Sequence, residues 1–191
     1  NFLHNMGGSW LDAGGNPSIA TPQAVAAFEL YGRLLRESGP PGSTNHTFTD
    51  VNTLLSSGRA AIIIEGTVFA GIYEDPQRSQ VAGKVGYVPM PTGPGGDHPV
   101  VNGWGVAMYA RGQKKEAAWT FMQWASSKET LLSLAMAGQG SPRTSVWNDP
   151  QFQAQSRSPA DWRQTLLHTV QVGTPLFAPP VIPVLGVRDF I

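Results

Sequence analysis

The chain has 191 residues, of which 41% are hydrophobic and 14% are charged, a composition that supports a folded core and excludes an intrinsically disordered chain. Thirteen Lys and Arg residues balance thirteen Asp and Glu residues, so there is no net charge to attract nucleic acid or an anionic membrane. The absence of cysteine excludes disulfides, thiolate metal sites and a cysteine nucleophile.

The first predicted helix spans about residues 22–38. Thr21 can cap its free amide groups, and Pro22 suits its first turn. Apolar residues then recur at spacings of three and four until Gly39 and Pro40, which end the pattern. We therefore expect an amphipathic helix with one face on the core.

A shorter helix is predicted after Thr47, whose spacing to Asp50 fits a capping box, and Gly58 would end it. Residues 60–64 form a continuous apolar run without alternation, which is typical of a strand buried on both faces of an α/β sheet. This run is the longest aliphatic stretch and is far shorter than the about 18 residues that a membrane span needs. A helix that ends before Pro76 is expected to follow it.

Two further strands are predicted at residues 84–88 and 105–110, on either side of a loop rich in glycine and proline over residues 89–99. Strands that alternate with helices indicate a layered α/β architecture. The long connections between them argue against a regular barrel.

A long helical region follows over about residues 113–137. Ser126 and Glu129 fit a second capping box, so this region is expected to form two helices. One more helix should open at residues 158–161, and the proline-rich stretch 174–183 should be largely extended.

Catalytic and metal-binding motifs are absent from the sequence. The four histidines show no ligand spacing, and Gly93–Gly96 is predicted to be a loop rather than a phosphate cradle, so no metal or cofactor is expected. A glycosidase would need two carboxylates about 5 to 10 Å apart across a cleft. Glu65 and Asp12 are the best-placed acids, but no second acid pairs locally with Glu65. A carbohydrate-active hydrolase using Glu65 therefore remains the alternative to a binding protein.

The six tryptophans fall into three classes by local sequence. Flanking glycines leave the rings of two of them without cover, so these rings are available to stack on the apolar face of a sugar, although packing inward from a turn is the other interpretation. These two are Trp10 and Trp104. The second class lies in predicted helices and is expected in the core: Trp119, Trp124 and Trp162. Trp147 lies in a predicted loop, and its sequence does not decide between the core and the surface.

Six sequence stretches occur in one order along the chain: FLHNMGGSWLD (2–12), SGRAAIIIEG (57–66), KVGYVPMPTGP (84–94), NGWGVA (102–107), KEAAWTFMQW (115–124) and GSPRTSV (140–146). Each stretch alone is a weak signal. As an ordered set that covers nearly the whole chain, they resemble the family 1 extracellular solute-binding proteins of ABC importers, which are mostly sugar binders.

This resemblance implies the type II periplasmic-binding-protein fold, in which two α/β lobes, each a layered sheet with flanking helices, close on ligand like a flytrap. Residues 1–191 would be the second, C-terminal lobe, residues from about 174 to 191 would be a partial return crossing, and the first lobe would be absent. The implied function is non-catalytic capture of a sugar or polyol and its delivery to the permease subunits of an ABC transporter. The implied location is periplasmic or extracellular, with a lipid tether as a variant.

The resemblance also implies which residues line the cleft: Trp10, Glu65, Gly66, Thr67, Asn102, Gly103, Trp104 and Arg143. The two indoles would stack on a ring, Gly103 would offer its amide, and the Arg143 guanidinium would reach two ligand oxygens. Local structural roles, a backbone hydrogen bond for Glu65 and the pinning of its own loop for Arg143, remain the other interpretations. Because half a cleft leaves apolar surface uncovered, self-association of the chain is a further hypothesis.

Overall fold

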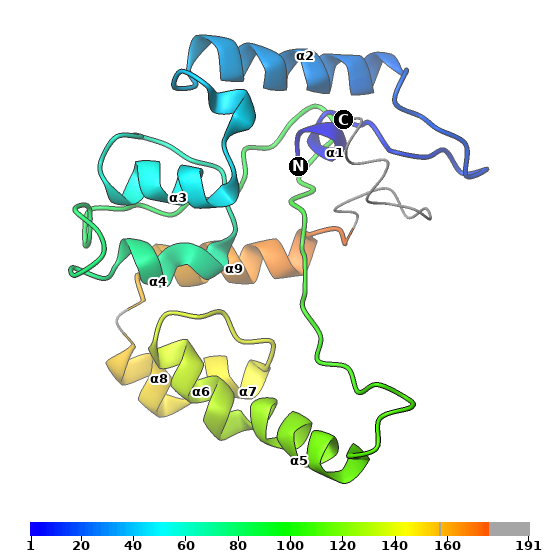
Figure 1. Cartoon of the computed structure of the whole chain (residues 1–191). Coiled ribbons are helices and arrows are strands. Elements are labelled where there is room, and N and C mark those ends of the chain that lie inside the picture. The colour runs from blue at the N-terminus through cyan, green and yellow to red at the C-terminus, as the bar shows by residue number, and fades with distance from the viewer. Residues whose placement is uncertain (157, 176–191) are drawn as a thin grey trace. The chain divides into compact units, whose positions relative to one another are not determined.

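The computed structural model describes residues 1–156 and 158–175, which form two compact units (Figure 1). Unit 1 comprises Asn1–Thr47, Val88–Asn102 and the described residues from Thr165 onward, and unit 2 comprises Phe48–Tyr87 and Gly103–Gln164. Most of the predicted return crossing lies outside the described residues. Within those ranges, none of the helices has the length and apolar character that a bilayer crossing requires.

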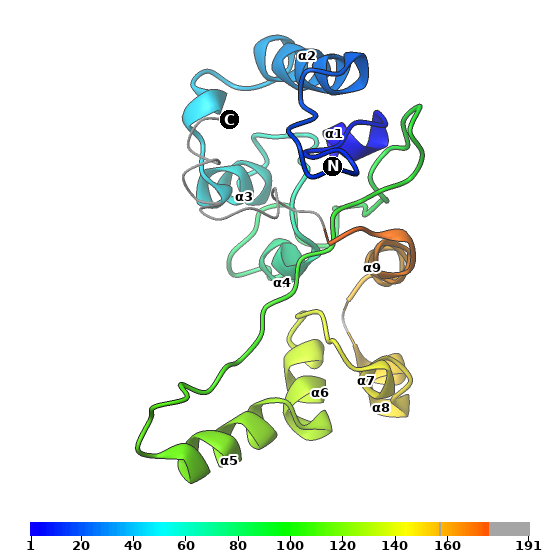
Figure 2. The same cartoon turned by 90° about the vertical axis from the view of Figure 1, so that its right-hand side faces the viewer.

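Unit 1 is built on α1 (Phe2–Asn5), α2 (Pro22–Glu37) and the 3-10 turn η1 (Ser43–Asn45). The predicted amphipathic helix is confirmed as α2, and the Thr21 side chain accepts a hydrogen bond from the backbone N–H of Ala24. Figures 1 and 2 both show α1 beside α2. The helices share a small core of Leu3, Ala24 and Ala27.

The loop over residues 89–99 is anchored to α1 by Asn5, which is buried. Its side-chain amide donates to the Pro91 carbonyl at 2.8 Å, and its side-chain oxygen accepts from the His98 backbone N–H at 2.9 Å. The Gly95 backbone N–H donates to the Asn5 carbonyl at 2.8 Å. Asn5 thus pairs its side-chain amide, its side-chain oxygen and its backbone carbonyl with three residues of this loop, and these hydrogen bonds hold the loop in unit 1.

Unit 2 consists of short helices, and sequence patterns predicted most of them. Gly58, at φ +70°, follows α3 (Phe48–Ser56), and Gly138, at φ +87°, follows α6 (Lys128–Met136), and the sequence predicted both helices. The structure adds α7 and α8, which no sequence pattern had indicated. The elements are α3 (Phe48–Ser56), η2 (Thr67–Phe69), α4 (Ala70–Tyr73), α5 (Lys115–Ala125), α6 (Lys128–Met136), α7 (Thr144–Trp147) and α8 (Pro150–Gln155), and α9 (Ala160–Val172) begins in unit 2 and ends in unit 1.

The break between α5 and α6 is where the sequence predicted it, but the capping residue is Ser127 and not Ser126. The Ser127 hydroxyl accepts the backbone N–H of Thr130 at 3.2 Å. Ser126 is still engaged with α5, since its hydroxyl donates to the Met122 carbonyl at 2.8 Å. A serine whose hydroxyl faces the preceding turn cannot cap the following one.

The predicted sheet is not formed in the part of the chain that the structure describes. Residues 60–64, 84–88 and 105–110 form no strand, and the β-pairing among the described residues is limited to isolated bridges outside these three segments. Ile62 is 86% exposed, the opposite of a strand buried on both faces. An apolar run becomes a strand only when a neighbour satisfies its backbone groups and covers its side chains, and neither condition is met here.

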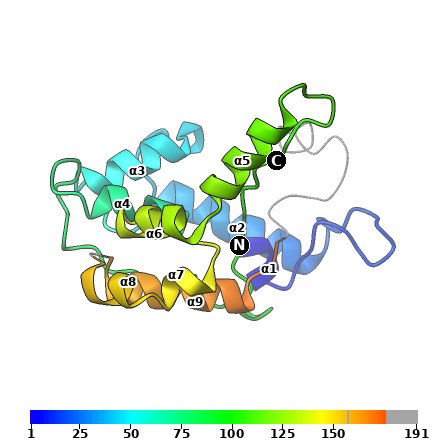
Figure 3. The same ribbon diagram turned by 90° about the horizontal axis from the view of Figure 1, so that it is seen from below.

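The core of unit 2 lies where α6, α7 and α8 meet, and it contains Ala135, Val146 and Phe152. Figures 1 and 3 show these three helices side by side. In contrast, α5 has no buried residue. The expectation that Trp119 and Trp124 lie in the core is therefore wrong, because they are 54% and 60% exposed.

Candidate functional site

Trp104 is almost fully exposed. Its side chain is 96% exposed, and a Cβ added to either neighbour, Gly103 or Gly105, would meet nothing within 4 Å. The prediction that flanking glycines leave this ring uncovered is confirmed. Asn102, the other residue of this turn, is also exposed, and the backbone passes from unit 1 to unit 2 between Asn102 and Gly103.

Trp10 differs, although it too follows two glycines. It is half-buried, packs against the α1–α2 core, and has its ring centroid 6.5 Å from that of Phe28. A Cβ at Gly8 would lie 2.5 Å from a methyl carbon of Leu3 and 3.3 Å from the Ala24 Cα. This glycine is needed for close packing of the chain on itself, so it does not bare the indole as the sequence suggested.

The turn at Glu65, Gly66 and Thr67 is exposed at its first two residues. A Glu65 carboxylate oxygen accepts the Gly66 backbone N–H at 2.8 Å, which is the local role that the sequence left open. The Thr67 carbonyl accepts the indole N–H of Trp162 at 2.9 Å. Burial, and then the negative charge of Glu65, raise the pKa of Tyr73, whose hydroxyl donates to the Asn52 side chain.

Arg143 is held by its own loop and by the α5–α6 junction. Its Nε donates to the Ser126 carbonyl at 2.7 Å, and its backbone N–H donates to the Ser141 hydroxyl at 3.2 Å. The side chain is exposed, and its two terminal nitrogens have no hydrogen-bond partner among the described residues. Pinning through Nε and ligand contact through the terminal nitrogens are therefore compatible.

A pair of indoles that sequence reasoning did not assign to the site contacts two of the loops that contain predicted site residues. Trp162, in the first turn of α9, is fully buried as predicted, and Trp147, which had been left open, is half-buried at the end of α7. Their ring centroids are 5.9 Å apart. The Trp147 indole N–H donates to the Ser141 carbonyl at 2.8 Å, as Trp162 does to Thr67. Sequence reasoning could have used one rule here: a buried indole N–H needs a hydrogen-bond acceptor, so a tryptophan expected in the core must bond to some other segment.

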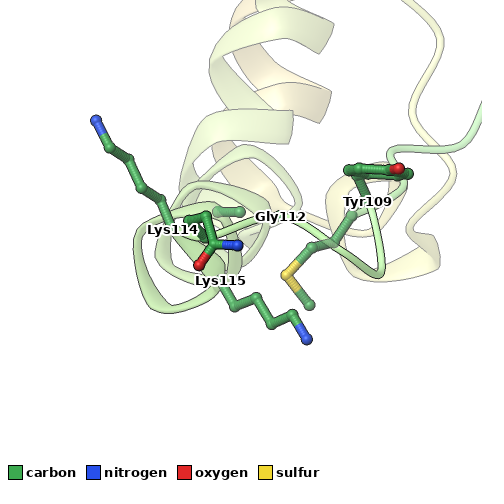
Figure 4. Close-up of a pocket in the computed structure, with 7 residues that line it drawn as sticks. Tyr109, Gly112, Lys114 and Lys115 are labelled. Atoms are coloured by element: carbon green, nitrogen blue, oxygen red, sulfur yellow. The ribbon is translucent and has the colours of Figure 1, made fainter.

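Two surface hollows lie away from these residues. The first, of about 270 Å³, precedes α5, and Figure 4 shows Lys114 and Lys115 extending from it in different directions. The second, of about 380 Å³, lies in unit 1. Neither contains a predicted site residue. The first is lined by Met108, Tyr109, Gly112, Gln113, Lys114, Lys115 and Ala118, and the second by His4, Gly7, Gly8, Gly95, His98 and Thr174.

Asp12, the other acid that the sequence singled out, closes a turn. One of its oxygens accepts the backbone N–H groups of Gly14 at 2.9 Å and Asn16 at 2.8 Å. Hydrogen bonds from Asn16 lower the pKa of this carboxyl. Within residues 1–156 and 158–175, no group of three or more acids, histidines or cysteines is arranged to hold a metal ion.

Comparison with known proteins gives consistent matches. A family model described as bacterial extracellular solute-binding protein matches residues 1–131. A probable amino-acid ABC transporter periplasmic-binding protein of Sinorhizobium fredii is 27% identical over 151 residues, which are 78% of this chain and 33% of that protein. The chain therefore spans about a third of the length of this curated relative.

Two solved structures share the fold with substantial sequence identity. The maltose-bound MalE3 of T. maritima superposes with a TM-score of 0.82 at 28% identity, covering 98% of this chain and 48% of that one. A solute-binding protein of an Agrobacterium radiobacter ABC transporter, in complex with ribitol, gives a TM-score of 0.81 at 34% identity, covering 94% of this chain and 45% of that one. These matches support the predicted periplasmic-binding-protein fold, and the chain belongs to the bacterial extracellular solute-binding protein family.

Proposed function

We propose that this chain is the second lobe of a two-lobed solute-binding protein and that it captures a sugar or polyol in a cleft that the first lobe completes. The chain spans under half of each of the two solved structures described above, and those structures hold maltose and ribitol.

The observation that carries the proposal is the exposed indole of Trp104. A side chain that is 96% exposed has its ring face open to solvent, and bare glycine backbone on both sides lets a ligand approach closely. Sugars and polyols present C–H groups that suit an aromatic face and hydroxyls that suit polar groups around it. In the proposal, Trp104 is the stacking surface and the neighbouring Asn102 side chain and Gly103 amide bind hydroxyls.

Three further elements are proposed to complete this half of the cleft. The free terminal nitrogens of Arg143 can bind two ligand oxygens in a bidentate manner. The turn of Glu65, Gly66 and Thr67, exposed at its first two residues, offers a carboxylate with one oxygen that has no hydrogen-bond donor among the described residues. Trp10, which is half-buried against the α1–α2 core, is proposed as a further ligand contact.

Binding is proposed to stabilise the closed arrangement of the two lobes, in which the protein delivers its solute to the permease subunits of an ABC transporter. The ligand favours the closed form by the difference in its affinity for the two forms. The proposed location is the periplasm or the outer face of a membrane. No catalytic step is proposed, because the family consists of binding proteins and Glu65 bonds to its own turn.

Isothermal titration of the full-length protein with ribitol, maltose and an amino acid tests this function. We expect a micromolar dissociation constant for at least one sugar or polyol, which corresponds to about 8 kcal/mol of binding free energy, and no hydrolysis of maltose. Binding of the amino acid alone, or no binding of any of the three, would refute the proposal. Hydrolysis of maltose that disappears in Glu65→Gln would establish the enzyme alternative instead.

We also propose that the 191-residue chain associates with further copies of itself. Unit 2 exposes several large apolar side chains, and exposed apolar surface of this kind can promote association. Sedimentation equilibrium of the 191-residue chain should give a mass that rises with concentration, and a constant monomer mass would contradict this. The side chains concerned are Ile62, Val106, Trp119, Phe121 and Trp124.

A further inference from the structure

The two indoles of Trp147 and Trp162 each form a hydrogen bond to a different loop of unit 2. Each has a single N–H group, and each donates it to a backbone carbonyl in a different loop of unit 2. Trp162 bonds to the Thr67 carbonyl at 2.9 Å, across 95 positions of sequence, and Trp147 bonds to the Ser141 carbonyl at 2.8 Å. Both acceptors lie in the loops assigned to the proposed cleft.

The rings are also in direct contact with each other. Their centroids are 5.9 Å apart with planes tilted by 46°, a favourable geometry for aromatic pairs. Phe152 meets the Trp147 ring edge-on at 5.3 Å, and the Arg163 guanidinium lies 5.9 Å from the Phe152 centroid. Phe152 is itself buried. The pair therefore rests on a packed support that restricts both rings.

We infer that the Trp147–Trp162 pair is a rigid link that positions the turn of residues 65–67 and the loop of residues 141–143 together. A displacement of either loop must break an indole hydrogen bond or move a ring against its neighbour. The effect on ligand affinity rests on the proposed function, since it requires that these loops line the cleft. Both tryptophans are positioning residues, because they reach the site through the carbonyls that they hold.

Hydrogen exchange on the unliganded full-length protein tests the link without any ligand. Trp147→Phe keeps an aromatic ring and removes the N–H to Ser141. We expect exchange to become about threefold faster, or more, both in residues 140–145 and in residues 64–69, although Trp147 forms no hydrogen bond to Thr67. Trp119→Phe, on the exposed α5, is the control and should change neither segment.

If Trp147 and Trp162 only stabilised the fold of unit 2, hydrogen exchange in their variants would show a different pattern. Loss of stability would accelerate exchange throughout unit 2, so peptides from α6 serve as the internal reference. Faster exchange confined to residues 140–145, or equal acceleration in α6, would overturn the inference. Trp162→Phe gives the reciprocal test, with acceleration expected in residues 140–145 through the ring contact.

Titration of the same variants with ribitol and maltose separates the inference from the proposed function. If the unmodified protein binds, Trp147→Phe should weaken binding about tenfold through loop misplacement, and Trp119→Phe should not. Binding that is unchanged in Trp147→Phe would overturn the role of the pair in the site and leave the proposed function intact. If the unmodified protein binds neither solute, the proposed function and the role in affinity both fail, and the exchange pattern alone decides whether the loops are linked.

Discussion

The aromatic cluster of Trp147, Phe152 and Trp162 contrasts with the aromatic residues that begin at Trp104 and continue along α5. In the cluster, Trp162 and Phe152 are buried, and both indole N–H groups have backbone acceptors. At Trp104 and along α5 the same kinds of side chain are exposed. The difference teaches that an indole is buried where a backbone carbonyl accepts its N–H and neighbouring side chains cover its ring. A position in a helix does not by itself bury it.

The two glycine-flanked tryptophans, Trp10 and Trp104, also differ because of the elements around them. Gly8 is in tight contact with Leu3 and Ala24, and Trp10 packs inward beside it. Gly103 and Gly105 have open space around them, and Trp104 points into solvent. A glycine beside an aromatic residue therefore permits either close packing or an open approach, and the surrounding elements decide which.

The largest expected effect is on the buried side of this contrast. Trp162→Ala should lower the free energy of unfolding by about 3 to 5 kcal/mol, because it leaves a cavity and removes the indole hydrogen bond to the Thr67 carbonyl. Trp119→Ala, which removes an exposed indole, should change it by less than about 0.5 kcal/mol. Urea unfolding followed by circular dichroism measures both, and similar losses for the two variants would remove the contrast.

Alkaline pH should test the burial of the Tyr73 hydroxyl. Burial raises the pKa of Tyr73 above the ordinary value of 10.0, so its neutral form persists in the folded protein while the unfolded protein ionises. Its contribution to stability is complete below about pH 10 and is lost as pH rises further, by at most about 1.4 kcal/mol per pH unit. Urea unfolding from pH 8 to 11 should show a shallower decline in Tyr73→Phe. A decline in Tyr73→Phe as steep as in the unmodified protein would show that the Tyr73 hydroxyl is not shielded as the structure describes.

A smaller effect separates two adjacent serines. Ser127→Ala should cost about 1 kcal/mol of stability, because it removes the hydroxyl that caps α6. Ser126→Ala should cost less than about 0.5 kcal/mol, since its hydroxyl bonds only to the preceding turn at an exposed position. If Ser126→Ala proved the more damaging change in urea unfolding, the cap predicted from sequence would be correct after all.

Features that depend on neighbours along the chain were predictable. Thr21 and Pro22 start α2 where the sequence predicts, and the glycines that follow α3 and α6 adopt positive φ. The capping error of one residue arose because the spacing of Ser126 to Glu129 fits a capping box, whereas Ser127 has Thr130 three residues later. Only geometry shows which hydroxyl faces the new helix.

Features that depend on distant segments were not predictable. Residues 60–64 have the composition of a buried strand, but a strand also needs a partner, which propensity does not supply. The link from Trp162 to Thr67 spans 95 positions and carries no local pattern. Trp119 and Trp124 share a helical pattern with buried tryptophans, and only the contacts of α5 show that they are exposed.

The most direct test of the central claim is a calorimetric comparison of Trp104→Ala with Trp119→Ala in the full-length protein, using whichever of ribitol and maltose binds. Both residues are exposed indoles of unit 2, so the two variants should be equally stable. The account predicts that Trp104→Ala weakens binding about tenfold or more, through loss of the stacking surface, while Trp119→Ala binds like the unmodified protein. Equal affinity of the two variants would contradict it.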